Sequence, residues 1–175
     1  MKNYCAVSLL LITASCSDNS NTREVANVAE EVPFIDSENG FRNHHFGDHI
    51  STFKGIKFLK KADSNGVKIY GLVEGYESDW KLENITLNSI AYYFKQDSLC
   101  QVMLVCNAEH SNELLRVAKE RYGDYTQIVP NKKVYHWQGK KEMVTYMPPS
   151  NGDRENSSVL ITSVAMSSRL KGKHK

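Results

Sequence analysis

Three histidines and one aspartate lie close together in the segment His44-His45-Phe46-Gly47-Asp48-His49. Imidazole nitrogens and carboxylate oxygens are common ligands of transition metals. In a helix, His45 and His49 would share one face and could bind a metal ion, with Asp48 or His44 beside them. Gly47 disfavours that helix. We therefore favour a polar loop with solvated histidines, and keep a metal-binding protein or an enzyme centred on this segment as the alternative.

The local motifs of catalysis and phosphate binding are absent from the sequence. It contains no G-x-S-x-G nucleophile elbow, no G-x-x-x-x-G-K-[ST] phosphate loop and no G-x-G-x-x-G. Glu109, His110 and Glu113 form a fainter cluster beside an expected helix start, where a histidine usually belongs to the cap. A catalytic triad assembled from distant positions leaves no local motif. We predict no catalytic residue and no cofactor, and expect a protein that is not an enzyme.

Aromatic side chains offer a second route to function, because exposed aromatic residues often anchor interfaces. Trp80 follows three polar residues, Glu77-Ser78-Asp79, and precedes Lys81. This setting predicts a loop that exposes Trp80 to a binding partner. The tyrosines and the second tryptophan, Trp137, are expected mostly in the core or in cross-strand pairs.

A folded core must position these residues, and the hydrophobic pattern predicts mainly strands. The β-prone segments are 67–73, 85–94, 99–106, 134–138, 142–147 and 159–166. Residues 95–98 and 139–141 are predicted hairpin turns. One helix is expected after Ser111 as N-cap, with Leu114, Ala118 and Tyr122 on one face and Gly123 as C-terminal cap.

Runs of strands around a single helix are typical of an α+β fold. We predict an antiparallel sheet of about five or six strands with one main helix packed across a face. The segment LCQVMLV, residues 99–105, is apolar on both faces, which predicts a central strand covered on both sides. The N-terminal segment or a partner protein would supply the second cover.

Cys100 and Cys106 are the cysteines of the expected domain. Six steps along a strand separate them by about 20 Å. A disulfide requires Cα atoms within about 7 Å. We therefore predict two small buried thiols rather than a redox pair.

Composition and charge exclude several classes of protein. The chain has 175 residues, of which 41% are hydrophobic and 24% charged, as in a soluble globular domain. A net charge of +2 is too small to drive nucleic-acid binding, so nucleic acid is not an expected partner. No segment approaches the roughly 20 apolar residues that cross a bilayer as a helix.

The N-terminus has the pattern of a secretory signal, with Lys2 followed by the short apolar segment 6–12. The sequence Ile12-Thr13-Ala14-Ser15-Cys16 resembles the lipobox of bacterial lipoproteins. In that family the signal is cut before a cysteine that then receives fatty acyl chains such as palmitate. Thr13 stands where the family usually has Leu or a similar aliphatic residue. The resemblance implies that Cys16 is lipidated; the alternative is an ordinary signal that leaves Cys16 as an unmodified thiol.

The resemblance also implies a place in the cell. In enteric lipoproteins an Asp directly after the cysteine marks retention at the inner membrane, and here Ser17 takes that position. The outer membrane is therefore favoured over the inner membrane.

The expected organisation is a signal peptide at 1–15, a lipidated cysteine and tether at 16–33, one α+β domain at 34–168 and a basic tail at 169–175. The segments YYFKQDSLCQVMLV, RYG and YHWQG, in this order, resemble small α+β extracytoplasmic lipoproteins of mostly uncharacterised function. We expect a non-catalytic binding or assembly module of the cell envelope, anchored in the membrane by lipid and engaging a protein or glycan partner. An immunity-type or inhibitor lipoprotein is a further alternative.

Overall fold

A computed structural model describes residues 34–62, 66–73, 80–149 and 155–170. By its internal contacts the chain divides into Met1–Glu30 and Glu31–Lys175, and the fold described below belongs to the second unit. The expected signal peptide, Cys16, the tether and residues 171–175 of the basic tail lie outside the described residues.

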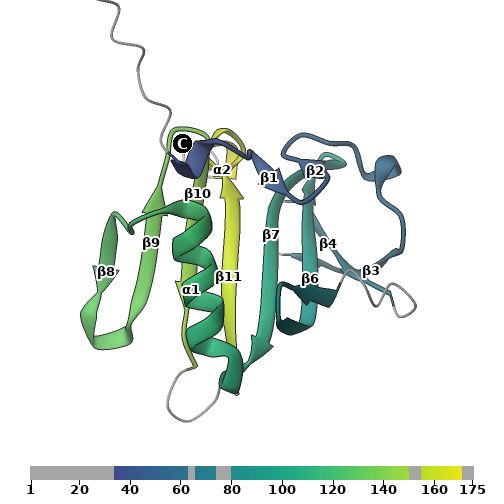
Figure 1. Cartoon of the computed structure of the whole chain (residues 1–175). Coiled ribbons are helices and arrows are strands. Elements are labelled where there is room, and N and C mark those ends of the chain that lie inside the picture. Colours follow the sequence, from purple (N-terminus) through teal and green to yellow (C-terminus); the bar gives the residue numbers. More distant parts are fainter. Residues whose placement is uncertain (1–33, 63–65, 74–79, 150–154, 171–175) are drawn as a thin grey trace, which may run out of the picture. The chain divides into compact units, whose positions relative to one another are not determined.

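One antiparallel sheet of nine strands organises this unit (Figure 1). The strand order is β3-β4-β6-β7-β11-β10-β9-β8, with β5 paired to β6, and every neighbouring pair is antiparallel. The strands are β3 (Ile56–Ala62), β4 (Val67–Leu72), β5 (Lys81–Leu82), β6 (Ile85–Lys95), β7 (Ser98–Asn107), β8 (Gln127–Val129), β9 (Val134–Gln138), β10 (Glu142–Met147) and β11 (Asn156–Ser163). A separate two-stranded sheet joins β1 (Gly40–Phe41) to β2 (His44–His45).

The structure confirms the predicted α+β class, the antiparallel sheet and the main helix. The predicted number of strands was wrong. The sheet has nine strands rather than five or six. The pattern missed β3 because lysines and a bulge between Phe58 and Lys60 break its alternation. It missed β5 and β8 because they contain two and three residues.

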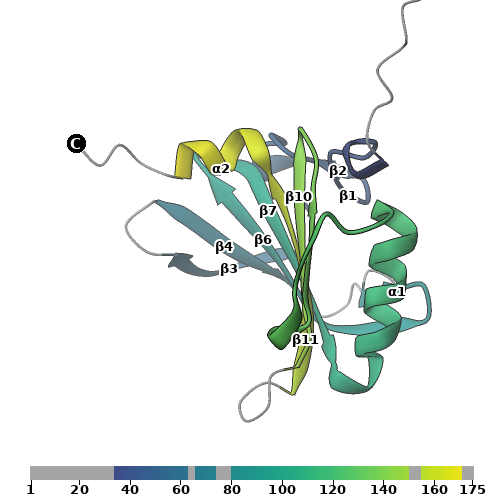
Figure 2. The same ribbon diagram turned by 90° about the vertical axis from the view of Figure 1, so that its left-hand side faces the viewer.

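The main helix, α1 (Ser111–Tyr122), lies along one face of the sheet, and α2 (Val164–Leu170) lies on the other side near one end (Figure 2). Gly123, with φ 75°, ends α1, and its N–H donates to the Lys119 carbonyl. Ser111 is not the N-cap as predicted, because a 3-10 helix, η4 (Ala108–His110), precedes α1. The last strand, predicted to reach residue 166, ends at Ser163, and α2 begins at the next residue, Val164.

The core lies between α1 and the sheet. Leu114 and Val117 of α1 line a small apolar cavity together with Leu104, Val159 and Ile161 of the sheet. The structure also contains the 3-10 turns η1 (Phe34–Asp36), η2 (Ile50–Thr52) and η5 (Pro130–Lys132), of which η1 contacts α1.

Cys100 and Cys106 are buried free thiols, as predicted. Burial raises the pKa of each to about 11, so both stay protonated at neutral pH. Neither thiol is therefore an activated nucleophile.

Candidate functional site

The histidine segment forms a strand and a turn rather than a helix. The His44 ring stacks on Phe53 with centroids 3.8 Å apart. The Asp48 carboxylate accepts a hydrogen bond from the His45 backbone N–H at 2.8 Å, and His49 Nδ1 accepts one from the Ser51 N–H at 3.2 Å. The side chains of His44, Asp48 and His49 therefore contact different neighbours and do not converge on one point.

The same segment is fixed against the β6–β7 hairpin by backbone hydrogen bonds. The Gly47 N–H donates to the Leu99 carbonyl at 2.9 Å, and the Leu99 N–H donates to the Asp48 carbonyl at 2.9 Å. Across the described ranges, no group of three or more His, Cys, Asp or Glu residues is arranged to hold a metal ion. Metal binding at His44, His45, Asp48 and His49 stays a prediction from sequence without support from these contacts.

Trp80 is less exposed than expected. It lies directly before β5, is half-buried and packs against the main core. Its indole therefore has only part of its surface free for a partner. A partner contact at Trp80 stays a prediction that this packing does not support.

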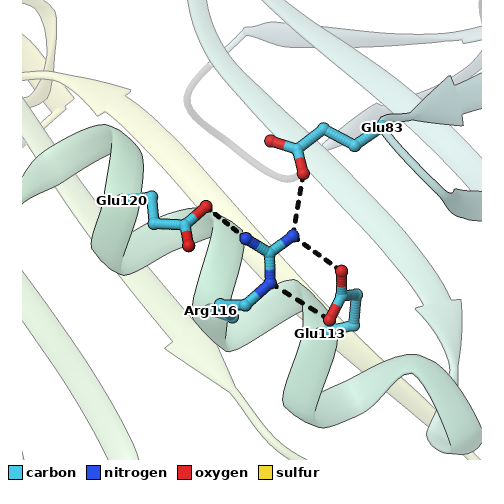
Figure 3. Close-up of polar contacts among 4 residues, drawn as sticks. All are labelled: Glu83, Glu113, Arg116 and Glu120. Carbon is cyan, nitrogen blue, oxygen red and sulfur yellow. Dashed lines mark hydrogen bonds and ion pairs between the residues drawn. The ribbon is translucent and has the colours of Figure 1, made fainter.

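Glu113, from the fainter cluster, belongs to an ion-pair network on α1 (Figure 3). Arg116 donates to Glu113 Oε1 at 2.7 Å and to Glu83 Oε2 at 2.8 Å, and it also pairs with Glu120. The hydrogen bonds to Glu113, Glu120 and Glu83 raise the pKa of Arg116, and the bond from Arg116 lowers the pKa of Glu113. Because Glu83 lies in the turn between β5 and β6, the network ties α1 to the sheet.

A buried carboxylate that the sequence pattern did not reveal holds the β9–β10 turn. Asp36, in η1, accepts backbone hydrogen bonds from Lys140 at 2.7 Å, Lys141 at 2.7 Å and Glu142 at 3.2 Å. Burial alone would raise the pKa of Asp36, but the three hydrogen bonds lower it below its ordinary value. Asp36 therefore joins η1, at the start of the described residues, to the β9–β10 turn as an anion.

Gly139 makes this contact possible. A Cβ atom at that position would overlap the Asp36 carboxylate and lie 2.7 Å from Ile35 Cγ2. We expect Gly139→Ala to destabilise the protein by about 2 kcal/mol, because η1 must move away from the turn. Urea unfolding measures the loss, with Lys141→Ala in the same turn as the control, since the Lys141 side chain is exposed. Equal stability of the two variants would contradict the close approach.

Glu142, next to this turn, is a buried acid whose carboxyl oxygens accept no hydrogen bond of ordinary geometry in the described part of the chain, although the Gly40 amide is near enough to affect its pKa. Its side chain is 0% exposed. Burial raises the pKa of Glu142 to about 7, with Glu38 adding to the increase and the Gly40 amide and Arg121 opposing it. A carboxyl group sealed from solvent lacks the access that a catalytic acid needs.

The sheet has one sealed face and one open face. On the side of α1, the side chains of the central strands each expose 3% or less of their surface: Val102, Leu104, Val144, Val159 and Ile161. Side chains alternate along a strand, so the intervening residues point to the other side. Thr162 of β11 is buried, but six of the other intervening residues are half-buried: Met103 and Val105 in β7, Leu160 in β11, and Met143, Thr145 and Met147 in β10.

The open face, defined by these six residues together with His136, is continuous across four strands. Met103 pairs with Leu160, Leu160 with Thr145, and Thr145 with His136, so the four lie in one row across the sheet. His136 Nδ1 lies 3.0 Å from Thr145 Oγ1, which places a polar pair at one end of the row. Among the described elements, the helix on this side is α2, which lies near one end of the sheet (Figure 2). The open face is the candidate binding site.

Comparisons with known proteins add no relative to this description. No protein-family model, curated protein or solved structure matches the chain. The helices of the described residues are all too short or too polar to cross a bilayer.

Proposed function

We propose that the protein is a lipid-anchored component of the bacterial cell envelope that binds a partner protein through the open face. One observation carries the binding role: the same strands expose almost nothing toward α1 and leave a band of Met, Leu and Val half-exposed on the other side. Methionine is enriched at protein interfaces, and its flexible thioether adapts to a partner surface.

The chemistry of the open face favours a protein over a glycan. Met103, Met143 and Leu160 offer apolar contact area and no hydrogen-bond donor, whereas sugar hydroxyls need many polar partners. Thr145 and His136 can supply hydrogen bonds beside the apolar band. Because Met, Leu and Val side chains carry no acid, base or strong nucleophile, the proposed role of this face is non-catalytic binding.

The anchor is proposed from the sequence at Ile12–Cys16. We expect the mature protein to begin at Cys16 and to carry fatty acyl chains there, because two or more chains give stable membrane attachment. Ser17 supports an outer-membrane location. Mass spectrometry of the protein purified from its native envelope tests the anchor, and an unmodified thiol or a retained leader would contradict it.

A pull-down from detergent-solubilised envelope tests the binding role. Leu160→Glu places a charge in the middle of the open face, and we expect it to lower recovery of the bound envelope protein about tenfold or more. Asn112→Glu is the matched control, because Asn112 is exposed on α1 and the change adds the same charge. Circular dichroism checks that both variants fold. Equal recovery with both variants, or no specific protein with the unchanged chain, would count against the proposal.

A further inference from the structure

The edge strand β3 exposes two neighbouring large hydrophobic side chains. Phe58 is 52% exposed and Leu59 is 48% exposed, the highest values for large hydrophobic residues in the described part of the chain. One edge of the sheet ends at β3, and β8 forms the other edge. The two residues therefore form an apolar tip far across the sheet from β8 and β9.

Lysines surround this tip. Lys54, Lys57, Lys60 and Lys61 are exposed. Lys68 on the neighbouring strand pairs with Asp97 at 2.8 Å, whereas within the described ranges no carboxylate pairs with the four lysines of the tip. Among the described residues, the result is a local excess of positive charge around two apolar side chains.

The backbone of β3 holds the two apolar side chains in place. The register shifts between Phe58 and Lys60, so β3 bulges at the tip. The Phe58 ring packs edge-on against Tyr70 with centroids 5.5 Å apart, and Leu59 lies over Gly71, whose missing side chain leaves it room. Tyr70 and Gly71 are successive residues of β4, so Phe58 and Leu59 lie on opposite faces at this edge, and each is supported on one side by β4.

We propose that this tip binds the anionic headgroup layer of a phospholipid membrane. Lysines near such a surface are attracted to it, and their long side chains keep the charge among the phosphates while aromatic and aliphatic groups enter the acyl boundary. The inference goes beyond the proposed function, because it concerns a different surface and does not require acylation of Cys16.

Strand addition by another protein fits this edge less well. Lysines and bulges on an edge strand oppose pairing with a further strand, since they repel a second copy and break the hydrogen-bond register. The tip combines both features with outward apolar residues. A lipid surface, which needs no register, satisfies the charge and the apolar groups together.

Vesicle co-sedimentation tests the proposal with the full chain carrying Cys16→Ser, so that no acyl chain contributes. We expect binding to vesicles of phosphatidylcholine with about one-third phosphatidylglycerol to exceed binding to phosphatidylcholine alone by about fivefold or more. Added salt should reduce the difference, because it screens the lysines. Equal binding to both vesicles, or no binding to either, would overturn the proposal.

Matched variants locate the contact. Lys57→Glu with Lys60→Glu should lower binding to the anionic vesicles about tenfold or more. Lys132→Glu with Lys133→Glu makes the same change of charge at the turn before β9 and should leave most of the binding. Phe58→Ser with Leu59→Ser should lower it severalfold at unchanged charge. An equal loss of vesicle binding in both double-lysine variants would also overturn the proposal. So would a protein that binds a polyglutamate peptide but not the anionic vesicles.

Discussion

The Glu142→Gln variant is expected to be more stable than the unchanged protein by roughly 3 kcal/mol at about pH 8, and almost equally stable at about pH 4. Glu142 is fully buried, and neither of its carboxyl oxygens accepts a hydrogen bond of ordinary geometry in the described residues. Its pKa is raised from the ordinary 4.5 to about 7, first by burial and then by the charge of Glu38.

The sign of the effect follows from proton binding. Between pH 4.5 and about 7 the folded protein holds the Glu142 proton while the unfolded chain has released it, so stability falls as pH rises through this window. Above about pH 7 the full penalty is present. Glutamine has nearly the same shape and no charge, so the variant escapes that penalty.

Urea unfolding of both proteins across this pH range measures the difference directly. The other titrating groups near Glu142 are Asp36, Glu38, Arg121 and Tyr122. All are present in both proteins, so most of their contribution cancels in the comparison. A difference in stability that does not change with pH would contradict the raised pKa of Glu142.

The second large effect is expected for Asp36→Ala, which should destabilise the protein by about 4 kcal/mol at neutral pH. The change removes the charged acceptor of three hydrogen bonds that the backbone N–H groups of Lys140, Lys141 and Glu142 donate, one of them buried and two partly buried. Asp36→Asn should lose less, because an amide oxygen still accepts hydrogen bonds.

The effect of Asp36 has its own pH dependence. Its folded pKa lies below the ordinary 3.8, so its contribution is complete above that value and is lost as pH falls through the folded pKa. Thermal unfolding should show the gap between Asp36→Ala and the unchanged protein narrowing only in strong acid. Asp124→Ala, at an exposed acid after α1, is the control and should change little. Similar losses for the two variants would contradict the role of Asp36.

The sequence was sufficient for elements whose pattern is long and local. α1 has a clear apolar face and a terminal glycine, and the turn at Gln96 and Asp97 joins two long β-prone segments. At the end of β11, by contrast, the run from Val159 to Met166 contains no glycine, proline or charged residue, and only Thr162 and Ser163 interrupt its apolar residues. Strand and helix periods cannot be distinguished in so short a run, so α2 was not predicted.

The functional surfaces were harder to predict because they depend on distant contacts. The Asp36 carboxylate accepts a hydrogen bond from the Glu142 N–H, although the two residues are 106 positions apart in the sequence. No local sequence pattern predicts such a contact. For β7, the pattern correctly indicated apolar residues on both faces, but only the structure shows that α1 seals one face while Met103 and Val105 stay half-exposed on the other. Sequence alone cannot tell a covered face from a face that awaits a partner.

Photo-crosslinking in living cells tests the central claim most directly. A photoreactive amino acid placed at Leu160 of the full chain lies in the middle of the open face, and one placed at Asn112 lies on the exposed side of α1. The proposed function predicts one discrete covalent adduct with an envelope protein from position 160 and none from position 112. No adduct from position 160, or the same adduct from both positions, would contradict partner binding through the open face.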